Sequence, residues 1–294
     1  MRYFKRLFIL IFVFFFATSF SLRKVDYREA MFKNVCKDLK HDVLLYYIFV
    51  DNKTTSPWTE YDIQSTVDSV KVAIRWLEEQ ARKNNVPLKI KSDYYIGPEY
   101  TTVNRNLPQP SVQKSVTEPN LKTGLKNINM WADAIAKRVG TTLNIAAKDG
   151  IPDVKNPKNK ERLIAYLRDT YQVESVALIF MVNNYFKNDI SIQINTFNTE
   201  DVEFAVVSYK YPAEIAHNFL HLYGAADMYE TAFRRNDSKI AQLQKLFPNE
   251  IMMEPYARKL TGLEISDYTQ YLIGWKNDYN PAYESLFTDK AYNF

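Results

Sequence analysis

The sequence predicts an α+β protein in which a β-sheet leads into one distinctive helix. Hydrophobic residues make up 46% and charged residues 24% of the 294-residue chain, which is the balance of a globular protein with a substantial core. Apolar runs typical of strands alternate with segments of helical spacing over the first two thirds of the chain. A short helical segment with two histidines four residues apart follows them. These three observations together predict the fold class.

The first elements are expected to be a strand, a helix and a second strand. Residues 43–50 (VLLYYIFV) are continuously apolar between two aspartates, which is typical of a strand buried on both faces. Residues 62–84 carry apolar side chains mostly at helical spacing, and Val86-Pro87 ends this segment. The alternation in 88–96 predicts the second strand. We therefore expect the first run to be a central strand.

The middle of the chain is expected to contain a loop, two helices and three strands. Residues 97–120 hold four of the twelve prolines, which predicts a long surface loop. The remaining elements follow from apolar periodicity: helices over 122–139 and 159–171, and strands over 175–182, 190–197 and 202–209.

Residues 1–21 are predicted to be an export signal. The basic residues Arg2, Lys5 and Arg6 precede an unbroken apolar run over 7–16, and small residues follow. A membrane anchor is the alternative, but spanning a bilayer takes about 20 apolar residues and this run is much shorter. We therefore expect cleavage, and export to the periplasm or out of the cell.

The charge balance argues against a nucleic-acid partner. The formal net charge is +4, but without the three basic residues of the signal the chain has 35 basic against 34 acidic residues. A protein that contacts phosphates needs a basic stripe, and no run of five like charges occurs. After cleavage of the signal we expect no membrane attachment either. The single Cys36 excludes an intrachain disulfide and is expected to be a small buried residue.

The helix that begins at Pro212 carries residues that can bind a metal. His217 and His221 are four residues apart, a spacing that stacks both imidazoles on one helical face, where two nitrogens can approach one ion at about 2.0–2.1 Å. Gly224 is a residue that ends helices in a left-handed conformation. The chain can reverse there, so that Asp227 supplies a third ligand and a fourth position stays open.

This pattern, His217-x3-His221-x2-Gly224-x2-Asp227, is similar to the HExxHxxGxxD motif of zincin metallopeptidases. The resemblance is to the snapalysin type, in which aspartate is the third zinc ligand. Residues 247–255 (FPNEIMMEP) also resemble the methionine-bearing turn that underlies the metal in many such enzymes.

The resemblance covers residues 200–275 and implies a zincin-like metallopeptidase fold, a mixed sheet with a metal-binding active-site helix, in one domain over 22–294. It also implies Zn²⁺ as cofactor, with His217, His221 and Asp227 as its ligands. Taken without the resemblance, the same residues also fit an amphipathic helix whose two histidines share the core face and whose glycine is an ordinary cap.

The chain departs from the family motif directly after the first histidine. The family has a glutamate there that takes a proton from zinc-bound water, whereas this chain has Asn218. An amide can orient a water but has no titratable proton near neutral pH, and loss of a general base typically costs about 100- to 10,000-fold in rate. Glu214, one turn earlier on nearly the same face, is a candidate substitute base, although a glutamate in a first turn also stabilises the helix N-terminus.

The sequence therefore predicts an exported zinc-binding, metallopeptidase-like protein that is catalytically weakened or inactive because of Asn218 and that binds a peptide or protein ligand. One alternative is an active zinc metallopeptidase that uses another base. A second alternative is a protein that binds a peptide or partner without a metal on a zincin fold.

Overall fold

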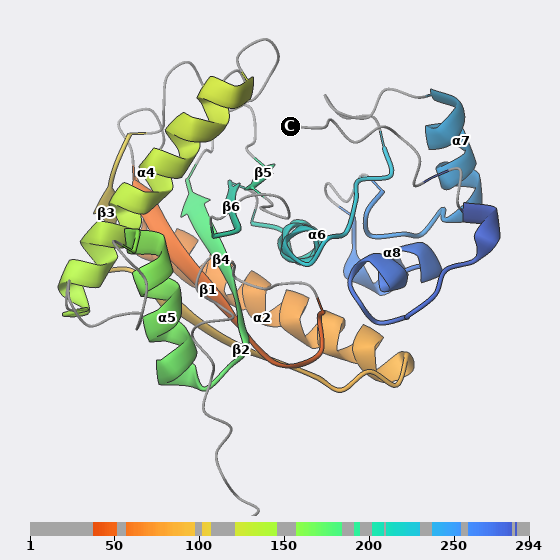
Figure 1. Ribbon diagram of the computed structural model, residues 1–294, viewed down its shortest axis with the longest axis horizontal. Coiled ribbons are helices and arrows are strands. Elements are labelled where there is room, and N and C mark those ends of the chain that lie inside the picture. The colour runs from red at the N-terminus through yellow and green to blue at the C-terminus, as the bar shows by residue number, and fades with distance from the viewer. Residues whose placement is uncertain are drawn as a thin grey trace, which may run out of the picture.

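A central sheet runs through the computed structural model (Figure 1), which describes residues 38–51, 57–97, 102–106, 121–145, 157–183, 191–194, 202–208, 210–229, 237–253, 258–283 and 286. The predicted export signal over 1–21 and Cys36 lie outside these residues. None of the helices in these ranges is long and apolar enough to cross a membrane.

The sheet is mixed and has the strand order β2-β1-β4-β6-β5, with a short strand β3 paired to the end of β1. Neighbouring strands are parallel, except that β5 runs antiparallel to β6. The protein is thus a mixed α/β protein, which is compatible with the α+β expectation, and the predicted strands occur in the expected order along the chain. The strands are β1 (His41–Asp51), β2 (Leu88–Tyr95), β3 (Val103–Asn104), β4 (Ser175–Val182), β5 (Ser191–Ile194) and β6 (Phe204–Val207).

Strand β1 is the central strand that the sequence predicts. It pairs with β2 on one side, where Val43 lies opposite Ile90, and with β4 on the other, where Val43 lies opposite Ser175. All eight residues of 43–50 are buried. Odd-numbered side chains of this run belong to one hydrophobic core and even-numbered ones to a second, because successive side chains of a strand point to opposite faces.

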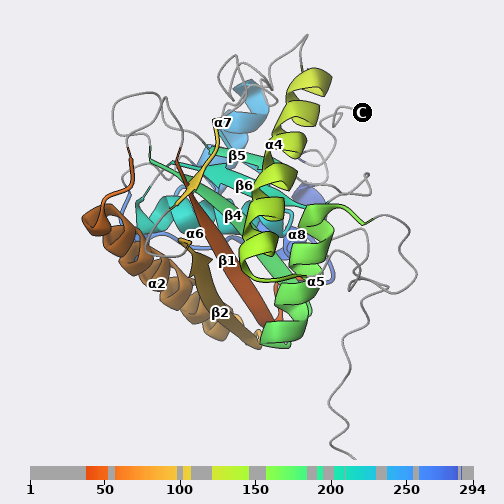
Figure 2. The same ribbon diagram turned by 90° about the vertical axis from the view of Figure 1, so that its left-hand side faces the viewer.

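Helices cover both faces of the sheet, which gives three layers (Figure 2). On one face lie α2 (Glu60–Lys83) and α6 (Pro212–Leu222), and on the other α4 (Leu121–Thr142) and α5 (Asn159–Tyr171). The helices α7 (Asp237–Leu246) and α8 (Asp267–Leu272) lie beyond α6, away from α4 and α5 (Figure 1). Short 3-10 turns occupy Leu260–Gly262 and Pro281–Tyr283.

The predicted boundaries hold with small shifts that have local causes. Helix α2 begins at Glu60 rather than at Asp62, because Thr59 caps it: the Thr59 Oγ accepts from the Asp62 amide at 3.2 Å, and the Asp62 carboxylate accepts from the Thr59 amide at 3.3 Å. Within the predicted loop over 97–120, strand β3 was not predicted. Two residues are too few for a periodic pattern, and the rest of that loop lies mostly outside the described residues.

Candidate metal centre

The turn after helix α6 brings Asp227 back over the histidines. The helix ends at Leu222, and Gly224 adopts a φ of 97°, a left-handed conformation that favours glycine. The amide of Ala225 donates to the Leu220 carbonyl at 3.2 Å, which closes the reversal. Three residues later the Met228 amide donates to the Met252 carbonyl at 2.9 Å and fixes the returning chain.

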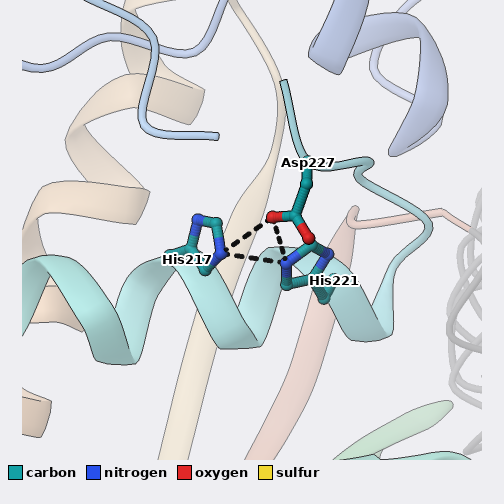
Figure 3. Close-up of side chains that lie close together, drawn as sticks. All are labelled: His217, His221 and Asp227. Carbon is teal, nitrogen blue, oxygen red and sulfur yellow. Dashed lines mark hydrogen bonds and ion pairs between the residues drawn. The ribbon is translucent and has the colours of Figure 1, made fainter. Parts of the chain in front are cut away.

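The three predicted ligands converge through one atom each (Figure 3). The Nε2 atoms of His217 and His221 lie 2.9 Å apart. The Asp227 Oδ1 lies 3.2 Å from the His217 Nε2 and 3.0 Å from the His221 Nε2. Both imidazoles are buried, and the Asp227 Oδ1 is buried as well, although the Asp227 side chain as a whole is 18% exposed.

Backbone carbonyls fix which imidazole nitrogen carries the proton. The His217 Nδ1 lies 3.1 Å from the Ile251 carbonyl oxygen, and the His221 Nδ1 lies 2.8 Å from that of Ala225. Since a carbonyl oxygen can only accept, each Nδ1 is the donor and each neutral ring presents a lone pair at Nε2. The Asp227 Oδ1 correspondingly has no hydrogen-bond donor among the described residues.

Three lone pairs therefore face one another in a buried place, an arrangement that a cation stabilises. A tetrahedral ion bound at about 2.0–2.1 Å separates its ligand atoms by about 3.3 Å, close to the 2.9–3.2 Å between these three atoms. Orientation of the ligating nitrogen by a hydrogen bond from the other ring nitrogen is also usual in metal sites. The residues His217, His221 and Asp227 could thus hold a metal ion.

Without a metal, the same geometry attracts a proton. Burial opposes charging of His221, but the Asp227 carboxylate outweighs burial and raises the pKa of His221. Burial and the neighbouring His221 lower the pKa of His217. The two histidines hold the pKa of Asp227 well below its usual range, although burial alone would raise it. In the metal-free group a proton is therefore held more tightly by His221 than by His217.

The Asn218 side chain is fully buried, and its hydrogen bonds go to residues other than the two histidines and Asp227. Its Oδ1 accepts from the Ser191 hydroxyl of β5 at 2.8 Å, and its Nδ2 donates to the Glu214 carbonyl at 2.9 Å. The amide thus fastens the edge strand to helix α6. The buried Glu214 side chain does not belong to the group of ligand atoms around His217.

The segment with two methionines, for which residues 247–253 are described, contacts His217 through its backbone. The Ile251 carbonyl orients His217, and Met252 is buried in the same core as helix α6. Glu250 is fully buried, and burial raises its pKa to about 7. Its carboxylate accepts from the amides of Met252 and Ser266. The likeness of this segment to a methionine-bearing turn stays a prediction. No local pattern indicates the roles of Ser191 and Glu250, because these depend on contacts between distant residues.

The fold and site define a mixed α/β protein with a buried group of two histidines and an aspartate that could hold a metal ion. In comparisons with known proteins, no family matches this chain and no curated protein matches it. The function therefore has to be inferred from the site itself.

Proposed function

We propose that this protein binds Zn²⁺ through His217, His221 and Asp227 and is a metallopeptidase-like protein of the zincin type with weak or no hydrolytic activity. Its working role is then to bind a peptide or protein ligand. Export from the cytoplasm belongs to the same proposal and rests on the sequence of residues 1–21.

The observation that carries the proposal is the convergence of two Nε2 lone pairs and one carboxylate oxygen within 3.2 Å. Two imidazoles with one carboxylate are ligands that suit Zn²⁺, and three protein ligands with an open position are the usual arrangement of catalytic zinc. The helix with its glycine turn and the segment 247–253 beneath it support the likeness to zincins.

Low activity follows from position 218. Bound zinc would lower the pKa of a water and polarise a carbonyl group. The residue that should take the proton is Asn218, and the described contacts of its amide go to Ser191 and to a backbone carbonyl. An amide cannot act as a general base near neutral pH.

Peptide binding is supported by the edge strand beside the site. Strand β5 pairs with β6, and no other described strand pairs with it. A free strand edge can bind an extended peptide by main-chain hydrogen bonds. The bond from Ser191 to Asn218 fastens this strand to the helix that carries the histidines, so a peptide on β5 would lie next to the zinc.

Metal reconstitution tests the proposal. The purified protein is stripped with a chelator and reloaded with Zn²⁺, and the bound metal is quantified together with its affinity against a competing chelator. We expect one zinc per chain, and an affinity at least about 100-fold lower in His217→Ala and His221→Ala, since loss of a ligand costs more than loss of an outer partner. His41→Ala is the matched control, because His41 is exposed at the start of β1. A zinc stoichiometry near zero after reloading would contradict the proposal and would favour the alternative of a protein that binds a peptide or partner without a metal.

A further inference from the structure

A cavity of about 270 Å³ lies on the α4/α5 face of the sheet, across the sheet from the metal centre. It is bounded by the end of β2, by the last turns of α5 and by Leu143 after α4. None of the three metal ligands lines it. Its volume lies just below the range of about 300–1,000 Å³ usual for binding sites of drug-sized molecules, so it suits a small ligand.

Five tyrosines line this cavity: Tyr46, Tyr94, Tyr95, Tyr166 and Tyr171. Tyr46 and Tyr95 are buried side chains of the core on this face, and Tyr166 and Tyr171 of α5 pack against the same core. Burial raises the pKa of Tyr46 and of Tyr171 far above the ordinary value, and the Asp93 carboxylate raises both further. The phenols of Tyr46 and Tyr171 therefore stay neutral at physiological pH.

Asp93 is the charged side chain that lines the cavity. It accepts hydrogen bonds from the Tyr94 amide at 2.7 Å and from the Tyr171 hydroxyl. No cationic side chain among the described residues pairs with it. The nearby Lys91 is held instead by the Asp42 carboxylate at 3.1 Å and by the Tyr171 carbonyl at 2.8 Å, and it does not line the cavity.

A carboxylate among tyrosines is an environment that favours a cation with an apolar surface. Aromatic rings attract ammonium groups through their quadrupoles. A carboxylate in a partly closed site adds a Coulomb attraction larger than that in bulk water. A neutral ligand of the same shape gains neither contribution.

We propose that this cavity binds a small organic ammonium ion, with its positive head against Asp93 and the surrounding tyrosines. The site is independent of the metal centre, so the two proposals can fail separately.

Titration with choline tests this inference, with 3,3-dimethyl-1-butanol as the neutral molecule of the same shape. Heteronuclear NMR of the full chain should show choline shifting the amides of 93–97 and 166–171, with the alcohol binding at least about tenfold more weakly. Equal binding of the two molecules, or shifts confined to other segments, would overturn the proposal. Binding to phosphatidylcholine vesicles without binding of free choline would also overturn it.

Variants test whether the Asp93 carboxylate is responsible for choline binding. Asp93→Asn keeps the acceptor for the Tyr94 amide and should weaken choline binding about tenfold. Asp68→Asn is the control, because Asp68 lies on α2 with its side chain 59% exposed. Tyr166→Leu should also weaken binding, and it serves as the second variant if Asp93→Asn does not fold. Unchanged choline affinity in both folded cavity variants would contradict the assignment.

Discussion

Replacing Asn218 with glutamate is expected to create peptidase activity while lowering the stability of the metal-free protein. Asn218 is fully buried, and its Nδ2 donates to the Glu214 carbonyl at 2.9 Å. A glutamate retains an acceptor for Ser191 but loses this donor, and it places a carboxylate in a buried position. One lost hydrogen bond costs about 1 kcal/mol and the buried charge adds a few more, so we expect a loss of about 2–4 kcal/mol without metal.

Zinc should reverse much of this loss, because a divalent ion next to the new carboxylate favours its charged form. With zinc bound, the glutamate can take a proton from a metal-bound water, and we expect cleavage of a fluorogenic peptide to rise about 100- to 10,000-fold over the wild type. The assay compares proteins loaded with zinc to the same stoichiometry. Urea unfolding with and without zinc measures the stability change.

Asn218→Gln is the matched control, because glutamine has the length of glutamate without a titratable proton. It should show no gain in cleavage. Equal rates for the glutamate and glutamine variants would refute the assignment of position 218 as the missing base. A wild type that already cleaves peptides as fast as the glutamate variant would refute the view that this protein is a weakened enzyme.

Three further changes have defined outcomes. Ser191→Ala removes the bond to Asn218 and should cost about 1 kcal/mol, with faster hydrogen exchange of β5 amides; unchanged exchange would contradict the fastening role. Gly224→Ala places an alanine at a backbone φ of 97°, which should lower the free energy of unfolding by about 1–2 kcal/mol. The strained turn should also displace Asp227 and weaken zinc binding, which a competition titration measures. Glu250 has its pKa raised from 4.5 to about 7, so the folded state holds its proton more tightly than the unfolded state. Wild-type stability should therefore fall by about 3 kcal/mol as the pH rises from about 4.5 through 7, and Glu250→Gln should lose this dependence in urea unfolding at pH 5 and 8.

The strands and helices could be predicted where one periodic pattern decides the structure. The run 43–50 is apolar on both faces because both faces of β1 are covered, whereas a strand with one face in water would alternate apolar and polar residues. Strand β3 has two residues and pairs only with the end of β1, so the local sequence holds no comparable signal. Strand β5 runs antiparallel to β6, and the apolar pattern of a strand does not indicate the direction of its neighbour.

The convergence of His217, His221 and Asp227 was predictable because helix geometry relates His217 to His221 and a glycine turn returns Asp227 within a few residues. The groups that orient them were not predictable in this way. The Ile251 carbonyl reaches His217 across 34 residues of sequence, and Ser191 reaches Asn218 across 27. Such contacts depend on the whole fold, and no local spacing encodes them.

The identity and position of the bound metal test the central proposal most directly. X-ray absorption at the zinc edge of the reloaded protein should show a four-coordinate ion with two imidazole nitrogens and oxygen ligands at about 2.0–2.1 Å. One imidazole should disappear in His221→Ala, while His41→Ala should leave the spectrum unchanged. A zinc shell without imidazole scattering, or no zinc in the reloaded protein, would contradict binding by His217, His221 and Asp227.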